Sequence, residues 1–289
     1  MHQKSLLAVL LALALAAMAC GIEINIPATQ IKTGPTQTDP ISVSLPSDEE
    51  GVTNVELDFG AGNLNLQPGA ETALISGTAT YNVADFKPVV TVDKDNVRIS
   101  QGDLKVGGIP SFQGNVKNTW DLQFAATPIN LAIRAGAYVG NYELGDLSLQ
   151  KLTVSDGAAD VTLSFSKPNR VEMETFTYET GASSVTITGL ANANVSQVTF
   201  KGGAGTYTLD FSGELKQDVT VSIEAGISTV TLTVPENVSA IVIFDGGLSD
   251  VNYSGGWKHT EGKYMHSGSG PTITITVKTG AGNLLLETK

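Results

Sequence analysis

Apolar and polar residues alternate along almost the whole chain from residue 51 to the C-terminus, and Val, Ile, Thr and Leu supply most of the alternation. A period of two is typical of strands that bury one face. No stretch shows the 3.6-residue apolar spacing with capping residues that a helix would have. The pattern therefore predicts an all-β protein.

Eight segments of this region share one pattern around a glycine. Apolar residues stand five and three positions before the glycine in every copy, and four and six positions after it in seven copies. The copy at Gly136 fits only with a two-residue insertion, which brings Tyr142 and Leu144 into the apolar positions. The eight glycines are Gly60, Gly136, Gly157, Gly181, Gly203, Gly226, Gly247 and Gly280.

Each copy is expected to form a strand, a tight corner at the glycine and a second strand, with the apolar positions facing inward. A sharp reversal often requires a positive φ, which glycine adopts freely, so these residues are interpreted as structural corner glycines. The Gly-x-Gly segments do not open a helix, which disfavours a phosphate or dinucleotide loop.

The spacing of the glycines predicts the architecture. From Gly136 to Gly247 they recur after 21, 24, 22, 23 and 21 residues. A near-constant step with two strands is typical of a β-solenoid, here a single-stranded β-helix with coils of about 22 residues. A β-sandwich of hairpins is the alternative, since its strands could have the same lengths, but it would not require equal steps.

Two intervals break this rhythm. The first, between Gly60 and Gly136, is rich in strand-like segments and is expected to cap the open end of the stack, because an exposed sheet edge invites aggregation. The second predicts a hairpin inserted near 254–272. We therefore expect N-terminal strands and a cap over 51–130 and solenoid coils over 131–289.

The N-terminus resembles an export signal. Leu6–Ala17 is an apolar run too short to cross a bilayer, which needs about 20 residues. Ala17-Met18-Ala19 precedes Cys20, the single cysteine of the chain, and the four residues resemble a lipobox. We expect a signal peptide over 1–19, a lipidated Cys20 and a Pro/Thr-rich tether over 20–50. Ordinary secretion, with Cys20 as a free thiol, is the alternative.

The chain is acidic, with a net charge of −12. Loss of Lys4 with the signal peptide leaves 16 basic and 29 acidic residues, a net charge of −13. This balance disfavours nucleic acid and anionic membrane surfaces as partners and is mainly expected to keep the protein soluble. A single cysteine allows no internal disulfide, so packing and hydrogen bonds must hold the fold.

The sequence offers little catalytic chemistry. His259, Glu261 and His266 lie in the Gly-rich insertion, where a solvated loop is favoured over a metal site because metal ligands must be held rigidly. No serine elbow stands between a strand and a helix, as nucleophilic catalysis on an α/β fold would require. We predict no catalytic residue, no metal and no cofactor.

Acidic pairs bracket two of the corners, Asp156 with Asp160 and Asp245 with Asp250. Paired carboxylates could serve glycoside cleavage, and oxygen ligands could bind calcium. The glycine-rich repeat of calcium-binding β-rolls is missing, however, and turn-favouring aspartates are the preferred interpretation.

The aromatic residues divide into two groups. Trp257, Tyr264 and Tyr138 fall outside the inward positions and, if exposed together, could grip a sugar or peptide by stacking. Six others fall on inward positions and are expected in the core: Phe176, Tyr178, Phe200, Tyr207, Phe244 and Tyr253.

These residues resemble a known family. Gly60–Leu66 followed by Gly77–Pro88, then Trp120–Leu122, Ile129–Ala137 and Gly157–Leu163, resemble the N-terminal module of bacterial toast-rack proteins. The later coils resemble the β-solenoids of LiaF-like and adhesin-like cell-envelope domains. The resemblance implies an envelope protein, in some relatives linked to stress signalling, and no family catalytic residues. LiaF-like proteins usually carry transmembrane helices, whereas this chain has a lipobox-like signal.

The expected function is a non-enzymatic, lipid-anchored module at the cell membrane or cell surface that binds or scaffolds an envelope protein or glycan. One alternative is a regulator of envelope-stress signalling. A second is an enzyme that acts on envelope polysaccharide.

Overall fold

The structure is a computed structural model that describes residues 28–47, 51–102 and 109–289. Within these ranges strands dominate, and the only helices are the 3-10 turns η1 (Ala84–Phe86) and η2 (Leu190–Ala193). No helix in the described ranges has the length and apolar character that a membrane crossing requires. The chain divides into two compact units, 1–33 with 104–115, and 34–103 with 116–289.

In the described residues of the smaller unit, β1 (Ala28–Lys32) and β7 (Ile109–Gln113) form a parallel pair in which Ala28 lies opposite Ile109. The predicted signal peptide and Cys20 lie outside the described residues. The tether predicted over 20–50 contains β1 and also β2 (Gln37–Val43), which belongs to the larger unit and pairs with β4 (Ile75–Tyr81).

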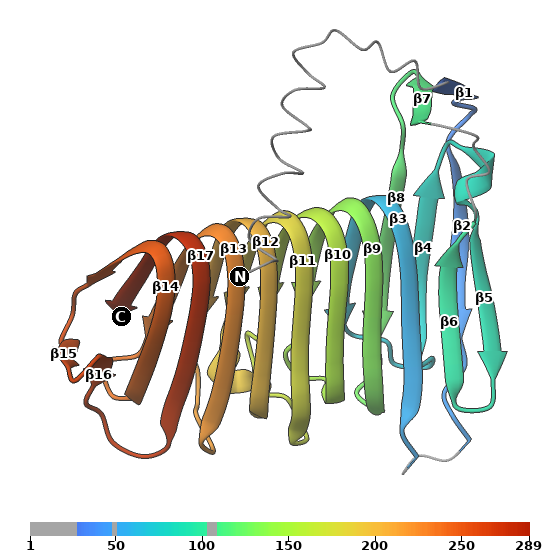
Figure 1. Ribbon diagram of the computed structural model, residues 1–289. Helices are drawn as coiled ribbons and strands as arrows, with labels where there is room; N and C mark the ends of the chain where they lie inside the picture. The colour runs from blue at the N-terminus through green and yellow to red at the C-terminus, as the bar shows by residue number, and fades with distance from the viewer. Residues whose placement is uncertain (1–27, 48–50, 103–108) are drawn as a thin grey trace, which may run out of the picture. The chain divides into compact units, whose positions relative to one another are not determined.

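The larger unit is a solenoid, as predicted, and Figure 1 shows its coils as arches lying side by side. Each coil contributes one continuous bent strand where two strands separated by a corner were expected, and each strand pairs in parallel with its neighbours. The coil strands are β3 (Thr53–Pro68), β9 (Pro128–Glu143), β10 (Ser148–Ser164), β11 (Met173–Thr188), β12 (Val195–Asp210), β13 (Val219–Val234), β14 (Ser239–Tyr253) and β17 (Thr272–Thr288).

The strands form a core because the inward positions of successive coils lie in register. Val198 pairs with Phe176 and Val221, and Leu209 pairs with Ile187 and Leu232, so each apolar residue stacks on its counterparts. Every predicted inward residue outside β14 is buried. Burying one such side chain stabilises the fold by about 1.5–3 kcal/mol, so a column of them outweighs many surface contacts.

The role of the corner glycines differs from the prediction, because none of the eight has a positive φ. The bend instead places the glycine and the next residue outward in succession, while the positions on either side of this pair face inward. Glycine is needed because the backbones approach closely. A Cβ added to Gly181 would lie 2.4 Å from the carbonyl oxygen of Gly157, and one added to Gly226 would lie 2.5 Å from that of Gly203.

The insertion predicted in the Gly136 copy is absent, which corrects the alignment of that coil. Ala61 pairs with Ala137 and Leu66 with Tyr142, so Gly140 occupies the inward position that Leu64 holds in β3. The aromatic rings of Tyr138 and Tyr142 fill the space that a side chain on Gly140 would take, at 2.9 and 3.0 Å from a built Cβ. The two tyrosine rings therefore keep the core filled at Gly140, which has no side chain of its own.

The predicted N-terminal cap is confirmed, and it covers both halves of β3. On the side of β3 away from β9, β6 (Asn96–Gln101) pairs with Asn54–Asp58 and β8 (Asn118–Phe124) pairs with Asn63–Pro68. Beyond these, β4 pairs with β8, β2 pairs with β4, and β5 (Pro88–Asp93) pairs with β6. Trp120 and Phe124 of β8 are buried and close this end of the core.

The last coils do not stack in the order of the sequence. The C-terminal strand β17 lies between β13 and β14 and pairs in parallel with both, so β14 is the last coil of the stack. Between them in sequence, β15 (Lys258–Thr260) and β16 (Lys263–His266) form an antiparallel hairpin, and β16 also pairs with Ala240–Ile243 of β14.

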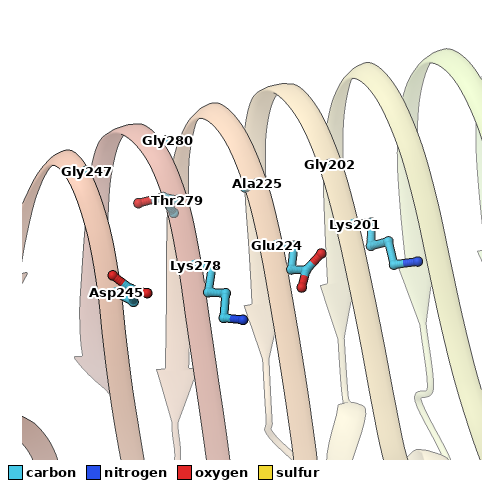
Figure 2. Close-up of a pocket in the computed structure, with 9 residues that line it drawn as sticks. All are labelled: Lys201, Gly202, Glu224, Ala225, Asp245, Gly247, Lys278, Thr279 and Gly280. Atoms are coloured by element: carbon cyan, nitrogen blue, oxygen red, sulfur yellow. The ribbon is translucent and has the colours of Figure 1, made fainter. Parts of the chain in front are cut away.

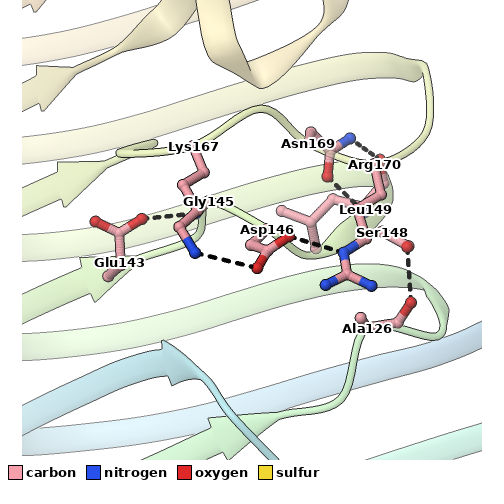
Figure 3. A network of polar contacts seen from close by, with 9 residues as sticks. All are labelled: Ala126, Glu143, Gly145, Asp146, Ser148, Leu149, Lys167, Asn169 and Arg170. Atoms are coloured by element: carbon pink, nitrogen blue, oxygen red, sulfur yellow. Dashed lines mark hydrogen bonds and ion pairs between the residues drawn. The ribbon is translucent and has the colours of Figure 1, made fainter.

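The loops between coils are tied together by side chains (Figure 3). Buried Asn169 accepts a hydrogen bond from the Leu149 amide at 2.9 Å and donates one to the Leu149 carbonyl at 2.8 Å, as a paired strand would. Nearby, Asp146 accepts hydrogen bonds from Arg170 and Lys167 of the following loop. Asn169 satisfies backbone groups that would otherwise be buried without partners.

Candidate functional site

A row of alternating charges crosses the outer face of the solenoid, two positions before the corner glycines. Parallel pairing in register places Glu179 beside Lys201, Lys201 beside Glu224, Glu224 beside Lys278, and Lys278 beside Asp245. Neighbouring strands lie about 4.8 Å apart, so each of the three inner charges has a charge of opposite sign on either side. We call these five residues the charge row, and Figure 2 shows four of them.

The two ends of the charge row differ in how the charges are satisfied. Lys201 forms a 2.8 Å ion pair with Glu179, and this hydrogen bond is the main reason that the Lys201 pKa is raised. Glu224, Lys278 and Asp245 are all exposed, and within the described ranges none of them forms an ion pair. Three charges in the order minus, plus, minus are thus available to a partner.

Charged residues near the N-terminal end, among them Asp58 and Arg134 at the position two before the glycine, form ion pairs within the protein. Arg98 contacts Asp58 at 2.6 Å, and Arg134 contacts Glu56 at 2.5 Å. The hydrogen bond from Arg134 is the largest cause of the lowered pKa of Glu56. The contrast between the ends makes the C-terminal part of the row the stronger candidate for an external contact.

An apolar crest adjoins these charges. The residue after each corner glycine is alanine in most coils, but it is Ile227 in β13 and Leu248 in β14, on either side of Ala281 in β17. Ile227 is 72% exposed and Leu248 is 84% exposed. We call these three residues the apolar crest. Exposed apolar residues bordered by polar groups are typical of protein-binding patches.

Between the charges and the crest lies an open depression of about 580 Å³, lined by Lys201, Gly202, Glu224, Ala225, Asp245, Gly247, Lys278, Thr279 and Gly280. The lining contains no His or Cys, so it offers no Ser–His or Cys–His pair. Glu224 and Asp245 lie on strands two steps apart, about 10 Å. Lys278 stands between them, where a glycosidase would need the scissile bond and water. The depression suits binding better than hydrolysis.

A second polar cluster lies inside the bend of β10 and its neighbours. Asp156 accepts hydrogen bonds from Tyr178 at 2.7 Å, from Tyr138 at 3.2 Å and from Thr180, and Tyr142 donates to Tyr138 at 2.9 Å. Burial is the main reason that the pKa values of all three tyrosines are raised. The tyrosines are buried, so this cluster has a structural role: it supplies hydrogen bonds to the half-buried carboxylate of Asp156.

The aromatic residues proposed as ligand contacts are not brought together. Tyr138 is buried in β9 and its ring lies 6.2 Å from that of Phe59, near the N-terminal end of the stack. Trp257 is buried at the other end, where its ring lies 5.6 Å from that of His266. Tyr264 lies at that end too, 5.4 Å from Tyr253. Tyr138 and Trp257 are thus buried in different parts of the stack, and the three residues do not form a common exposed surface.

Four of the six aromatics expected in the core are buried, namely Phe176, Tyr178, Phe200 and Tyr207. The prediction was wrong for the two in β14: Phe244 is partly exposed and Tyr253 is 47% exposed. The physical reason is that β14 is the last coil, so no further coil covers its inward side.

The two histidines of the β15–β16 hairpin contact other residues of the protein and do not form a ligand site. His266 is buried and donates a 2.8 Å hydrogen bond through Nδ1 to the Val238 carbonyl, whereas His259 is exposed and stacks on Tyr264. In the described part of the chain no group of three or more His, Cys, Asp or Glu residues could hold a metal ion. Cys20, the predicted lipidation site, lies outside the described residues.

Among known families, the model described as the N-terminal domain of toast_rack, DUF2154, matches residues 32–188 and again residues 168–233. Together these cover more than half of the chain. The protein belongs to the toast-rack family. The second match starts within the coils, in agreement with a repeated unit. A comparison with curated proteins found no match for this toast-rack protein.

Several solved structures are similar to this chain. A "putative cell adhesion protein" from Clostridium sporogenes is 21% identical, with a TM-score of 0.48 over 88% of this toast-rack chain and 100% of that chain. A "putative adhesin" from Bacteroides fragilis is 13% identical, with a TM-score of 0.43 over 89% and 99%. A "putative lipid binding protein" from Parabacteroides distasonis is 10% identical, with a TM-score of 0.41 over 89% and 99%. At these values the likenesses carry no argument about function.

Sequence reasoning missed the charge row and the apolar crest of this toast-rack protein, although both leave a signal in the aligned repeats. The position two residues before the glycine reads Glu179, Lys201, Glu224, Asp245 and Lys278 in sequence order. The alternation becomes complete only when the last strand is moved between β13 and β14. The crest appears as Ile227 and Leu248 in a column of alanines.

Proposed function

We propose that this toast-rack protein is a non-enzymatic module of the bacterial cell envelope that binds or scaffolds another envelope component. An acylated Cys20 would hold it at the membrane. The observation that carries the proposal is the pairing of unsatisfied charges with exposed apolar residues on one surface: Glu224, Lys278 and Asp245 lie beside Ile227 and Leu248.

The chemistry of this surface favours a protein partner. Large apolar side chains that enter a partner's pocket supply most of the binding energy of an interface, and a polar surround supplies orientation. Ile227 and Leu248 can act as such anchors. The surrounding charges, of which two are negative and one positive, would select a partner segment of the opposite pattern.

Site-specific photocrosslinking in cells tests this proposal. A photoreactive residue in place of Leu248 should give adducts that are absent when the same residue replaces Asp160, which is exposed on β10. Lys278→Glu should weaken the Leu248 adducts because it removes the one positive charge of the patch.

The identity of the adduct separates the possible functions. A surface protein or glycan would support the binding function. A sensor kinase or its membrane partner would support the alternative, a regulator of envelope stress. No adduct beyond the Asp160 background would contradict a binding role for this surface. An adduct with a second copy of the chain, recognised by its mass, belongs to the inference below.

A further inference from the structure

The two ends of the solenoid are closed to different extents. At the N-terminal end, β6 and β8 together pair with both halves of β3. At the other end, β16 pairs only with Ala240–Ile243, and within the described ranges no strand lies along the outer edge of Phe244–Tyr253. The second half of β14 therefore presents unpaired backbone N–H and C=O groups.

The inward side chains of this half-coil are also incompletely covered. Val251 is partly exposed and Tyr253 is 47% exposed, whereas their neighbours in β17, Leu284 and Leu286, are 0% and 1% exposed. An open edge that combines free backbone groups with apolar side chains is a template for pairing with another strand. The edge carries no lysine or proline that would discourage such pairing.

We propose that the second half of β14 pairs antiparallel with the same strand of a second copy, so that two solenoids join end to end. The bend at Gly246–Leu248 limits straight pairing to the residues after it. Opposite residues in a two-fold antiparallel pair must face the same side of the sheet. Centring the axis on Val251 meets this condition and joins the two apolar interiors.

Charge and hydrogen bonding select the register. With the axis at Val251, Asp250 lies opposite Asn252 of the second copy, and Ser249 lies opposite Tyr253. An axis at Asp250 would bring two carboxylates face to face, which destabilises a cross-strand pair. The Val251 register therefore pairs each carboxylate with an amide that can donate to it.

Symmetry distinguishes this arrangement from its competitor. Another exposed apolar edge is β5, where Val89 and Val92 are 51% and 58% exposed. Pairing of β14 with β5 of another copy would be head to tail and would build open filaments. Pairing of β14 with β14 of a second copy would leave no free β14 edge, so assembly would end at the dimer. A closed dimer is the arrangement we infer.

Single-cysteine variants test the register directly. Cys20 is the only cysteine, so Cys20→Ser gives a cysteine-free chain. In this background Val251→Cys places two thiols across the axis with Cα atoms about 4.5–5.5 Å apart, within disulfide range. For Asn252→Cys the two Cα atoms would be about 7–8 Å apart, too far for ready closure. Asp160→Cys, on a coil inside the stack, reports random collision.

We expect mild oxidation to convert the Val251→Cys protein to a covalent dimer several-fold faster than either the Asn252→Cys or the Asp160→Cys protein. Faster crosslinking of Asn252→Cys would overturn the register. Equal rates for Val251→Cys and Asp160→Cys would overturn the dimer itself. Because this readout requires no partner molecule, it can fail or succeed independently of the proposed binding function.

Sedimentation equilibrium of the Cys20→Ser protein provides a second measurement. We expect a concentration-dependent monomer–dimer equilibrium that Val251→Lys abolishes by placing two like charges at the axis, while Thr231→Lys on β13 leaves it intact. A monomer at every concentration, or growth beyond the dimer, would contradict the proposal. Unchanged far-UV circular dichroism would show that Val251→Lys is folded.

Discussion

A Cβ atom on Gly203 would lie 2.4 Å from the carbonyl oxygen of Gly181 in the neighbouring coil. The same relationship connects corner glycines along the stack, so these residues form a column in which each backbone covers the next. The column explains why glycine recurs at the bend although its φ angles are open to other residues.

The first prediction concerns this column. Gly203→Val should lower the free energy of unfolding by about 1–3 kcal/mol, because the coils must move apart to admit the side chain. Ala204→Ile is the matched control one position along, where Ile227 and Leu248 already occupy the same place in other coils, and should change stability by less than about 0.5 kcal/mol. Urea unfolding measures both, and an unaffected Gly203→Val protein would refute the close approach.

The second prediction concerns the carboxylate inside the bend. Asp156→Ala should destabilise the protein by at least about 2 kcal/mol, because it leaves the hydroxyls of Tyr178, Tyr138 and Thr180 without their acceptor. Asp156→Asn, which keeps one oxygen acceptor, should cost less. Asp160→Ala, on the exposed side of the same strand, should have little effect on urea unfolding. Equal losses at the two positions would argue against the cluster.

The third prediction concerns alkaline pH. Burial and the hydrogen bond to Asp39 raise the pKa of Tyr81 from 10.0 to about 12, and burial raises the pKa values of Tyr138, Tyr142, Tyr178 and Tyr207. Below pH 10 these tyrosines hold their protons in both states. Above it the unfolded chain loses them first, so stability should fall as the pH rises from 10 towards 12 and beyond.

Phenolate absorbance and circular dichroism, followed together, check this expectation. Most tyrosine ionisation should coincide with unfolding, and Tyr81→Phe should remove part of the pH dependence between pH 10 and 12. Full ionisation of the tyrosines near pH 10 with an intact β-sheet spectrum would show that they are open to solvent.

The fourth prediction concerns the charge row. Lys278→Glu would place three negative charges on adjacent strands and should destabilise the fold by roughly 1 kcal/mol, whereas Lys278→Gln should cost less. Raising the salt from about 0.1 M to about 1 M shortens the Debye length from about 10 to 3 Å and should remove most of the difference. A salt-independent difference would point to packing in place of charge.

The fifth prediction concerns membrane attachment. Cys20→Ser should move the protein from the membrane fraction to the soluble fraction, because each buried methylene of a lipid chain contributes about 0.8 kcal/mol of membrane affinity. Fractionation followed by immunodetection gives the readout. Retention of the variant in membranes would rule out a lipid on Cys20 as the anchor.

Much of the fold could be predicted from local sequence. The inward positions were found because period-two alternation and a glycine at a fixed place define them within each copy, as at Val198, Phe200 and Leu209. What failed depended on contacts between copies. Position 203 requires glycine because of its close approach to Gly181, 22 residues earlier in the chain. The side chain missing at Gly140 is replaced in the core by the ring of Tyr138, at a position where other coils have small residues.

The candidate site was harder to predict because it depends on the order of coils. Glu224 and Asp245 belong to consecutive repeats, and stacking in sequence order would set two negative charges side by side. Only the placement of β17 between their strands brings Lys278 into the gap. Two like charges at the same position of consecutive copies therefore indicate that another strand lies between those copies in the folded sheet.

The position of β17 also has a consequence for biogenesis. The ribosome makes β17 after β14, yet β17 lies between β13 and β14 and is hydrogen-bonded to both. Until β17 emerges, β14 lacks the neighbour with which it pairs in the folded protein. A chain that stopped before β17 would therefore lose two coils and not one, so the completion of β17 acts as a checkpoint for maturation.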